Sequence, residues 1–129
     1  MKDLYVVTEV AIAGGGIQYA YVPVPCRGNV NSVKMVYDAE MDADETTTVS
    51  RGATAVNLVT PTGALAAGNV VTGVPDTDNK ALVFDPDSDT VVNRVLKIAF
   101  ADEFDAAGTA ALWIQFDDAA YVKADPSEV

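Results

Sequence analysis

The feature that most constrains this chain is a two-residue alternation of apolar and polar side chains over residues 90–116. In 90–100 one face is apolar apart from Arg94, and its members are Val92, Leu96, Ile98 and Phe100. In 109–116 the apolar face comprises Ala110, Leu112, Ile114 and Phe116, and the other face carries Thr109, Trp113 and Gln115. Successive side chains point to opposite faces of a strand, so the pattern predicts two half-buried strands. Because an acidic connection at 101–108 joins them, we expect a central antiparallel hairpin.

Shorter alternating segments separated by Gly, Pro, Asn and Asp fill the rest of the chain, which indicates strands joined by turns. They cover residues 4–13, 17–25, 30–37, 46–49, 53–60, 70–74, 81–84 and 119–123. Roughly eight to ten short strands with frequent turn signals are typical of a sandwich or barrel. We therefore expect a single all-β domain over residues 1–129, an antiparallel, jelly-roll-like β-sandwich.

Two prolines predict that the segment 17–25 is an edge strand or a chain end that leaves a sheet, and not a central strand. Pro23 and Pro25 are two residues apart, so both missing N–H groups fall on one side of the strand. Tyr19 and Tyr21 share one face of the same segment. They form either an exposed binding strip or half-buried sheet aromatics whose hydroxyls reach water.

The charge of the chain excludes two classes of partner. The 19 acids and 8 bases give a formal net charge of −11, which is opposite to the basic surface that binds nucleic acid or anionic lipid. All but two of the acids fall in expected loops or near the chain ends, so the rims of the sandwich should be acidic. The N-terminal apolar run is interrupted by Thr8 and Glu9, so we expect no standard export signal and synthesis in a cytoplasm.

The absence of histidine and the single cysteine limit the chemistry that the chain can perform. They exclude an internal disulfide, a Cys/His zinc site and any histidine-dependent acid–base relay. Cys26 is either a reactive thiol or a small buried hydrophobe, and the second is the more common state of a lone cysteine. The sequence thus predicts a protein that is not an enzyme.

Carboxylates offer the remaining routes to a metal site or to catalysis. Acids alternate over 38–44 and 85–89, as at the start of a calcium loop, but neither run has the later glycine and glutamate ligands. Asp117 and Asp118 are the best-placed pair for glycoside hydrolysis, yet two acids at a strand end are ordinary solvated residues. We predict no catalytic residue, no cofactor and no metal site.

The segment 92–122, VNRVLKIAFADEFDAAGTAALWIQFDDAAYV, and the turn-rich 46–68, TTTVSRGATAVNLVTPTGALAAG, carry a family resemblance. In these segments the chain resembles the head decoration, or cement, proteins of tailed bacteriophages, and the likeness extends in style over the whole length. The resemblance implies a structural protein of the virion that binds the outside of an assembled capsid. Its partners would be the major capsid protein and further copies of itself, as a dimer or, slightly favoured, a trimer. The family shares no catalytic or ligand-binding residues, so none is transferred to this chain.

Two other classes of β-sandwich protein fit the same composition. A phage tail or fibre component would use such a module, and so would a carbohydrate-binding domain. The latter needs an exposed aromatic cluster, for which Tyr19, Tyr21 and Trp113 are the candidates.

Overall fold

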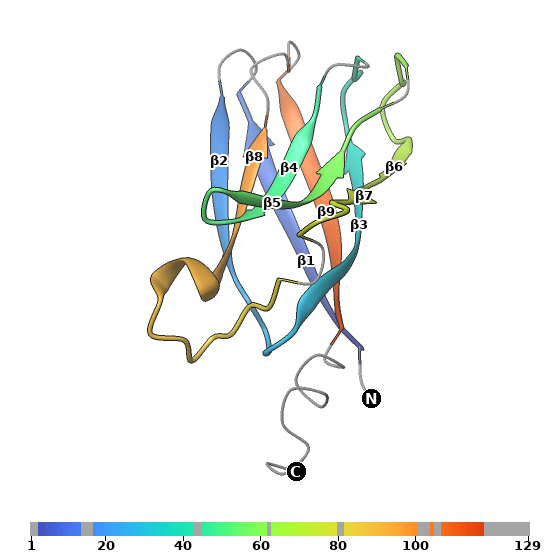
Figure 1. Cartoon of the computed structure of the whole chain (residues 1–129). Coiled ribbons are helices and arrows are strands. Elements are labelled where there is room, and N and C mark those ends of the chain that lie inside the picture. The colour runs from blue at the N-terminus through green and yellow to red at the C-terminus, as the bar shows by residue number, and fades with distance from the viewer. Residues whose placement is uncertain are drawn as a thin grey trace.

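A computed structural model of the chain describes residues 3–13, 17–42, 45–61, 63–79, 82–100, 104 and 107–117, with the side chains of 3–5 and 117 left out. The described part is nearly all β and forms two antiparallel sheets (Figure 1). The strands are β1 (Asp3–Ile12), β2 (Gln18–Pro23), β3 (Asn29–Tyr37), β4 (Thr47–Arg51), β5 (Thr54–Val59), β6 (Val70–Thr72), β7 (Val74–Pro75), β8 (Val95–Phe100) and β9 (Gly108–Asp117). A single 3-10 turn, η1 (Val91–Asn93), precedes β8.

The strand order is that of a jelly roll, as the sequence predicted. One sheet has the order β1-β9-β3-β6 and the other β2-β8-β4-β5-β7. The first half of the chain pairs with the second half in reverse order: β1 with β9, β2 with β8, β3 with β6, and β4 with β5. The short β7 extends the second sheet beyond β5. Consecutive strands therefore pass repeatedly from one sheet to the other, which is the jelly-roll arrangement.

The predicted central hairpin is wrong. β8 and β9 belong to different sheets: β8 pairs with β2 and β4, and β9 pairs with β1 and β3. The alternating pattern reports which face of a strand is buried, but backbone hydrogen bonds choose the neighbour and carry no side-chain signature. Two successive strands with apolar faces fit that pattern when they pair in one sheet, and they fit it equally well when they lie in opposite sheets and face each other across the core.

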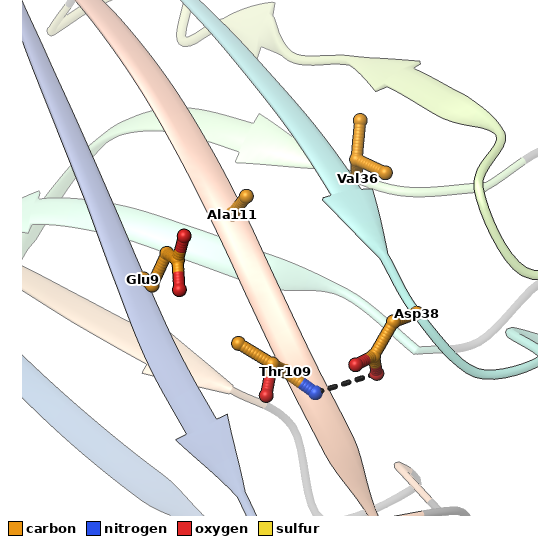
Figure 2. Close-up of a pocket in the computed structure, with 5 residues that line it drawn as sticks. All are labelled: Glu9, Val36, Asp38, Thr109 and Ala111. Carbon is orange, nitrogen blue, oxygen red and sulfur yellow. Dashed lines mark hydrogen bonds between the residues drawn. The ribbon is translucent and has the colours of Figure 1, made fainter.

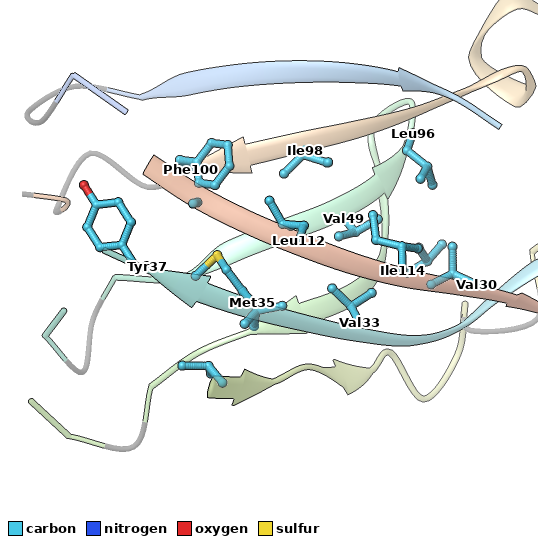
Figure 3. Packing of buried hydrophobic residues seen from close by; sticks show 14 of the residues in the cluster. Val30, Val33, Met35, Tyr37, Val49, Leu96, Ile98, Phe100, Leu112 and Ile114 are labelled. Atoms are coloured by element: carbon cyan, nitrogen blue, oxygen red, sulfur yellow. The ribbon is translucent and has the colours of Figure 1, made fainter. Parts of the chain in front are cut away.

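The inward faces themselves are as predicted. Leu96, Ile98 and Phe100 of β8 face the apolar residues of β9, and all are fully buried (Figure 3). Val92 is an exception, because it lies in η1 before the strand begins and remains 43% exposed. On β3 the buried set Val33, Met35 and Tyr37 also follows the expected period of two.

The chain passes from β6 in one sheet to β7 in the other at Gly73. Its N–H donates to the carbonyl of Val33 at 2.7 Å, which holds the crossing segment against β3. A Cβ at this position would overlap Oδ1 of the buried Asn57 and lie 3.1 Å from a methyl of Val59. The crossing therefore requires glycine for space, since its φ is not positive.

The segment between β7 and β8 contains no strand among its described residues, contrary to the expectation for 81–84. Phe84 forms only an isolated bridge with Gly28, and its ring packs edge-on against Phe116 at 6.1 Å. Arg51 ties this segment to β4 by donating from Nη1 to the carbonyl of Val83 at 2.9 Å. The expected strand at 119–123 lies outside the described residues.

Glu45 departs from the expectation that the acids coat the rims. It precedes β4 and is 1% exposed, close to an aromatic cluster at the end of the sandwich. In that cluster Phe104 packs edge-on against both Tyr37 at 5.4 Å and Phe100 at 5.9 Å. Burial and then the carboxylates of Glu45 and Asp38 raise the pKa of the Tyr37 phenol above its usual value of 10.0.

Candidate functional site: the outer face of the five-stranded sheet

A row of side chains crosses the whole outer face of the five-stranded sheet. Residues directly opposite each other in paired strands share a face, and the register aligns one residue from each strand. From edge to edge the row is Tyr19, Ala99, Thr48, Leu58 and Val74. Its two ends are the most open, with Tyr19 50% and Val74 67% exposed. This row, together with Ile17, Tyr21 and Lys97, is called the sheet B face below.

Aromatic and aliphatic groups gather at the β2 end of the sheet B face. Tyr21 is 63% exposed and stands opposite Lys97 of β8, while Ile17 continues the same alternation before β2 begins. The Lys97 ammonium lies 4.7 Å from the centroid of the Tyr19 ring, a cation–π contact. The ring and the ammonium hold each other in position, so the end of the row presents a fixed positive charge among apolar surfaces.

The sheet B face differs from the rest of the molecule in its charge. None of the strands β2, β4, β5, β7 and β8 contains an aspartate or glutamate, although the chain has 19 acids. The charged residues of these strands are Arg51 and Lys97. Arg51 is directed to the Val83 carbonyl, so Lys97 supplies the cation of the face.

Both edges of this sheet are closed to strand addition. Pro23 lies in the edge strand β2, as the sequence predicted, and Pro75 lies in the opposite edge strand β7. A proline cannot donate to a further strand, so edge-to-edge pairing is disfavoured at both sides. Backbone pairing with a further strand is therefore disfavoured at Pro23 and at Pro75, which leaves the face as the open surface of this sheet.

The outer face of the other sheet has a mixed character. Val7 is 70% exposed there and stands in one row with Trp113 of β9 and Lys34 of β3. The Lys34 ammonium lies 5.3 Å from the centroid of the Trp113 ring. The three aromatic candidates for a carbohydrate cluster are thus separated, since Trp113 lies on the opposite side of the sandwich from Tyr19 and Tyr21.

A shallow depression of about 310 Å³ opens on this second face (Figure 2). It arises because the small Ala111 of the central strand β9 stands in register between Glu9 of β1 and Val36 of β3. Asp38 bounds one end, where its Oδ1 accepts a hydrogen bond of 2.6 Å from the Thr109 backbone N–H. The lining combines the carboxylates of Glu9 and Asp38 with the aliphatic Val36 and Ala111, so the depression is an open, acidic hollow.

Of the two acid runs that the sequence singled out, 85–89 forms a turn, whereas the described part of 38–44 bends and bridges to Leu65 through Met41. The loop at 76–79, outside both runs, forms a similar turn. Asp85 Oδ1 accepts from the Asp87 N–H at 2.9 Å, and Asp76 Oδ1 accepts from the N–H groups of Asp78 and Asn79 at 3.0 Å. Such bonds stabilise turns without any ligand. Within the described ranges, no three His, Cys, Asp or Glu side chains converge on a point where a metal ion could sit.

The lone cysteine and the acid pair at the end of β9 were the remaining candidates from the sequence. Cys26 is half-buried against the core, and so it is less enclosed than a buried hydrophobe. The side chain of Asp117, at the end of β9, and the whole of Asp118 lie outside the described part of the chain. In the same described part, no helix is long and apolar enough to cross a membrane.

Sequence reasoning missed Leu58, Val74 and Lys97 as members of one surface. Their segments are separated in the chain, and only the strand register aligns them. The available signal was the absence of acids from these five strands, but the strands could not be assigned to one sheet without the pairing. A scan against protein-family models finds no match to this chain, and a search of curated protein sequences finds none either.

Proposed function

We propose that this protein is a non-enzymatic structural protein of a bacteriophage virion that binds the outside of the capsid and stabilises the shell. The observation that carries the proposal is the sheet B face: an acid-free, largely apolar surface on a molecule of net charge −11. Apolar residues exposed across a whole sheet face are typical of a surface that a partner covers. The family resemblance supplies the identity of that partner, the major capsid protein.

The rigid jelly roll suits a role in which the protein braces a shell. The two sheets pack around one hydrophobic core to which both contribute, with Leu96 and Phe100 from β8 and Leu112 from β9, so we expect the outer face to keep its shape when a partner binds. Binding to the assembled shell and not to free subunits would stabilise the shell by mass action. Many weak contacts repeated over a symmetric lattice add up to tight attachment through avidity.

The test is co-sedimentation of the purified protein with capsids that lack it. We expect binding by the natural protein and loss of binding by a Tyr21→Ser, Leu58→Ser double variant, because both side chains lie on the sheet B face. A Val7→Ser variant is the matched control, since Val7 is 70% exposed, more than either Tyr21 or Leu58, but lies on the other sheet. Absence of co-sedimentation at low salt would refute the proposal, and so would equal loss in the control.

The oligomeric state belongs to the same proposal. We expect a dimer or trimer, with the trimer slightly favoured, or a monomer that assembles only on the shell. Light scattering at increasing protein concentration measures the mass. A plain monomer at high concentration, together with no co-sedimentation, would leave the capsid role without support.

A carbohydrate-binding module is the second candidate. One observation favours it: Tyr19 and Tyr21 are exposed on the same side of a flat strand, and tyrosine rings stack on sugars. Titration with common polysaccharides, using Tyr21→Ser as the control, distinguishes this function from capsid binding.

A further inference from the structure

We infer that the sheet B face docks against an apolar protein surface that carries carboxylates. The Lys97 ammonium pairs with one of those carboxylates. This inference deepens the proposed function, on which it rests only for the identity of the partner. The chemistry that it assigns can be tested without a capsid.

The sheet B face carries a charge opposite in sign to that of the whole molecule. Lys97 is the cation of a face whose five strands contain no acid, so the local charge is positive on a strongly negative molecule. The Tyr19 ring fixes the ammonium at 4.7 Å and reduces the freedom that an exposed lysine normally has. A partner carboxylate meets no opposing carboxylate from these strands, whereas a cationic partner would be repelled by Lys97.

The charge of the sheet B face also disfavours its packing against the same face of a second copy in a symmetric dimer. A two-fold interface brings the same patch of each subunit together. Such packing of the sheet B face would place two positive patches against each other with no acid from these strands to compensate. The opposite face differs, because Lys34 is accompanied there by Glu9 and Asp38.

The sheet B face is poorly suited to polyanions such as nucleic acid and anionic membranes. Nucleic acid and anionic membranes are held by many cations, each neutralising a phosphate. Among the described residues of this face, Lys97 is the one cation. The apolar row from Tyr19 to Val74 also offers more area to a protein surface than to a phosphate chain. A carboxylate within an apolar protein surface matches one fixed ammonium beside Tyr19, Leu58 and Val74.

The experiment uses two small probes with the same ring and opposite charge, 3-phenylpropionate and 3-phenylpropylammonium, followed by shifts of backbone amide resonances. We expect the propionate to shift amides of β2 and β8 around Lys97, and the ammonium to leave them unchanged. The net charge of −11 attracts the ammonium probe and repels the propionate probe. A preference of this face for the propionate would therefore come from the local groups around Lys97. Lys97→Met should weaken the propionate effect by on the order of threefold.

Lys34→Met is the matched control, because it removes a lysine that also lies over an aromatic ring, on the other sheet. It should leave the propionate shifts on β2 and β8 unchanged. The inference is overturned if the propionate shifts no amide of these strands, if the ammonium shifts them equally, or if Lys97→Met has no effect. It is also overturned if sedimentation shows self-association that Lys97→Met abolishes, which would assign the face to a second copy.

Failure of this inference is distinguishable from failure of the proposed function. If the natural protein co-sediments with capsids and Lys97→Glu binds them equally well, the capsid role stands and the assigned chemistry is wrong. If the propionate result holds but no capsid binds, the face has the assigned chemistry and the proposed partner is wrong.

Discussion

Replacing Gly73 with alanine tests how tightly the crossing between the two sheets is packed. The new methyl group would overlap Oδ1 of Asn57 and lie 3.0 Å from its Cγ and 3.1 Å from Val59 Cγ2. Asn57 is fully buried, so its amide cannot move into solvent to make room. Neither amide atom of Asn57 has a hydrogen-bond partner in the described structure, and the variant therefore breaks no side-chain hydrogen bond there.

The expected cost follows from overpacking alone. Additional methyl groups in a packed interior typically cost about 1–3 kcal/mol. For a domain of this size, each kcal/mol lowers the melting temperature by about 3–5 °C. Gly73→Ala should therefore melt about 3–15 °C below the natural protein.

The assay is a urea or thermal melt beside two controls. Gly63→Ala is the matched substitution, because a Cβ there meets nothing within 4 Å and its φ is not positive, so its stability should change by no more than about 1 kcal/mol. Adding Asn57→Ala to Gly73→Ala removes the overlapped atoms and should restore part of the loss, with a coupling of about 1 kcal/mol. If Gly73→Ala and Gly63→Ala have the same melting temperature, the close packing at the crossing is refuted.

Three further predictions concern the core, its pH dependence and metal ions. Leu112→Ala should cost about 2–5 kcal/mol in urea melts and Trp113→Ala less, and a neutral Leu112→Ala would contradict its position in the core. Because the pKa of the Tyr37 phenol is raised in the folded state, the unfolded chain loses the phenolic proton first as the pH rises. The contribution of Tyr37 to the free energy of unfolding is therefore complete below pH 10.0 and is lost as the pH rises through the folded pKa. Tyr37→Phe should flatten that loss in melts between neutral and alkaline pH, and an unchanged slope would argue against it. Millimolar calcium should raise the melting temperature by no more than about 1–2 °C through screening, whereas a large rise reversed by a chelator would reveal a metal site.

Side-chain alternation was sufficient to predict the class of fold and most of the core. The inward positions of β3, β8 and β9 follow from it, because the two faces of a strand have a strict period of two. Pro23 predicted the edge position of β2 for an equally local reason, the missing N–H. Glu45 was not predictable in this way, since only the tertiary structure buries it, near Tyr37 of the aromatic cluster.

The sequence by itself determined most of the segments that form strands, which side of the longer strands is apolar, and that the molecule is strongly acidic. The tertiary structure alone decided that β8 and β9 lie in different sheets and that Tyr19, Leu58 and Val74 lie in one row. Strand pairing is made by backbone hydrogen bonds, which every residue except proline offers in the same way, so the neighbour of a strand leaves no mark on its side chains. The acid-free strands are visible in the sequence, but they become one positive, apolar face only when pairing brings them side by side.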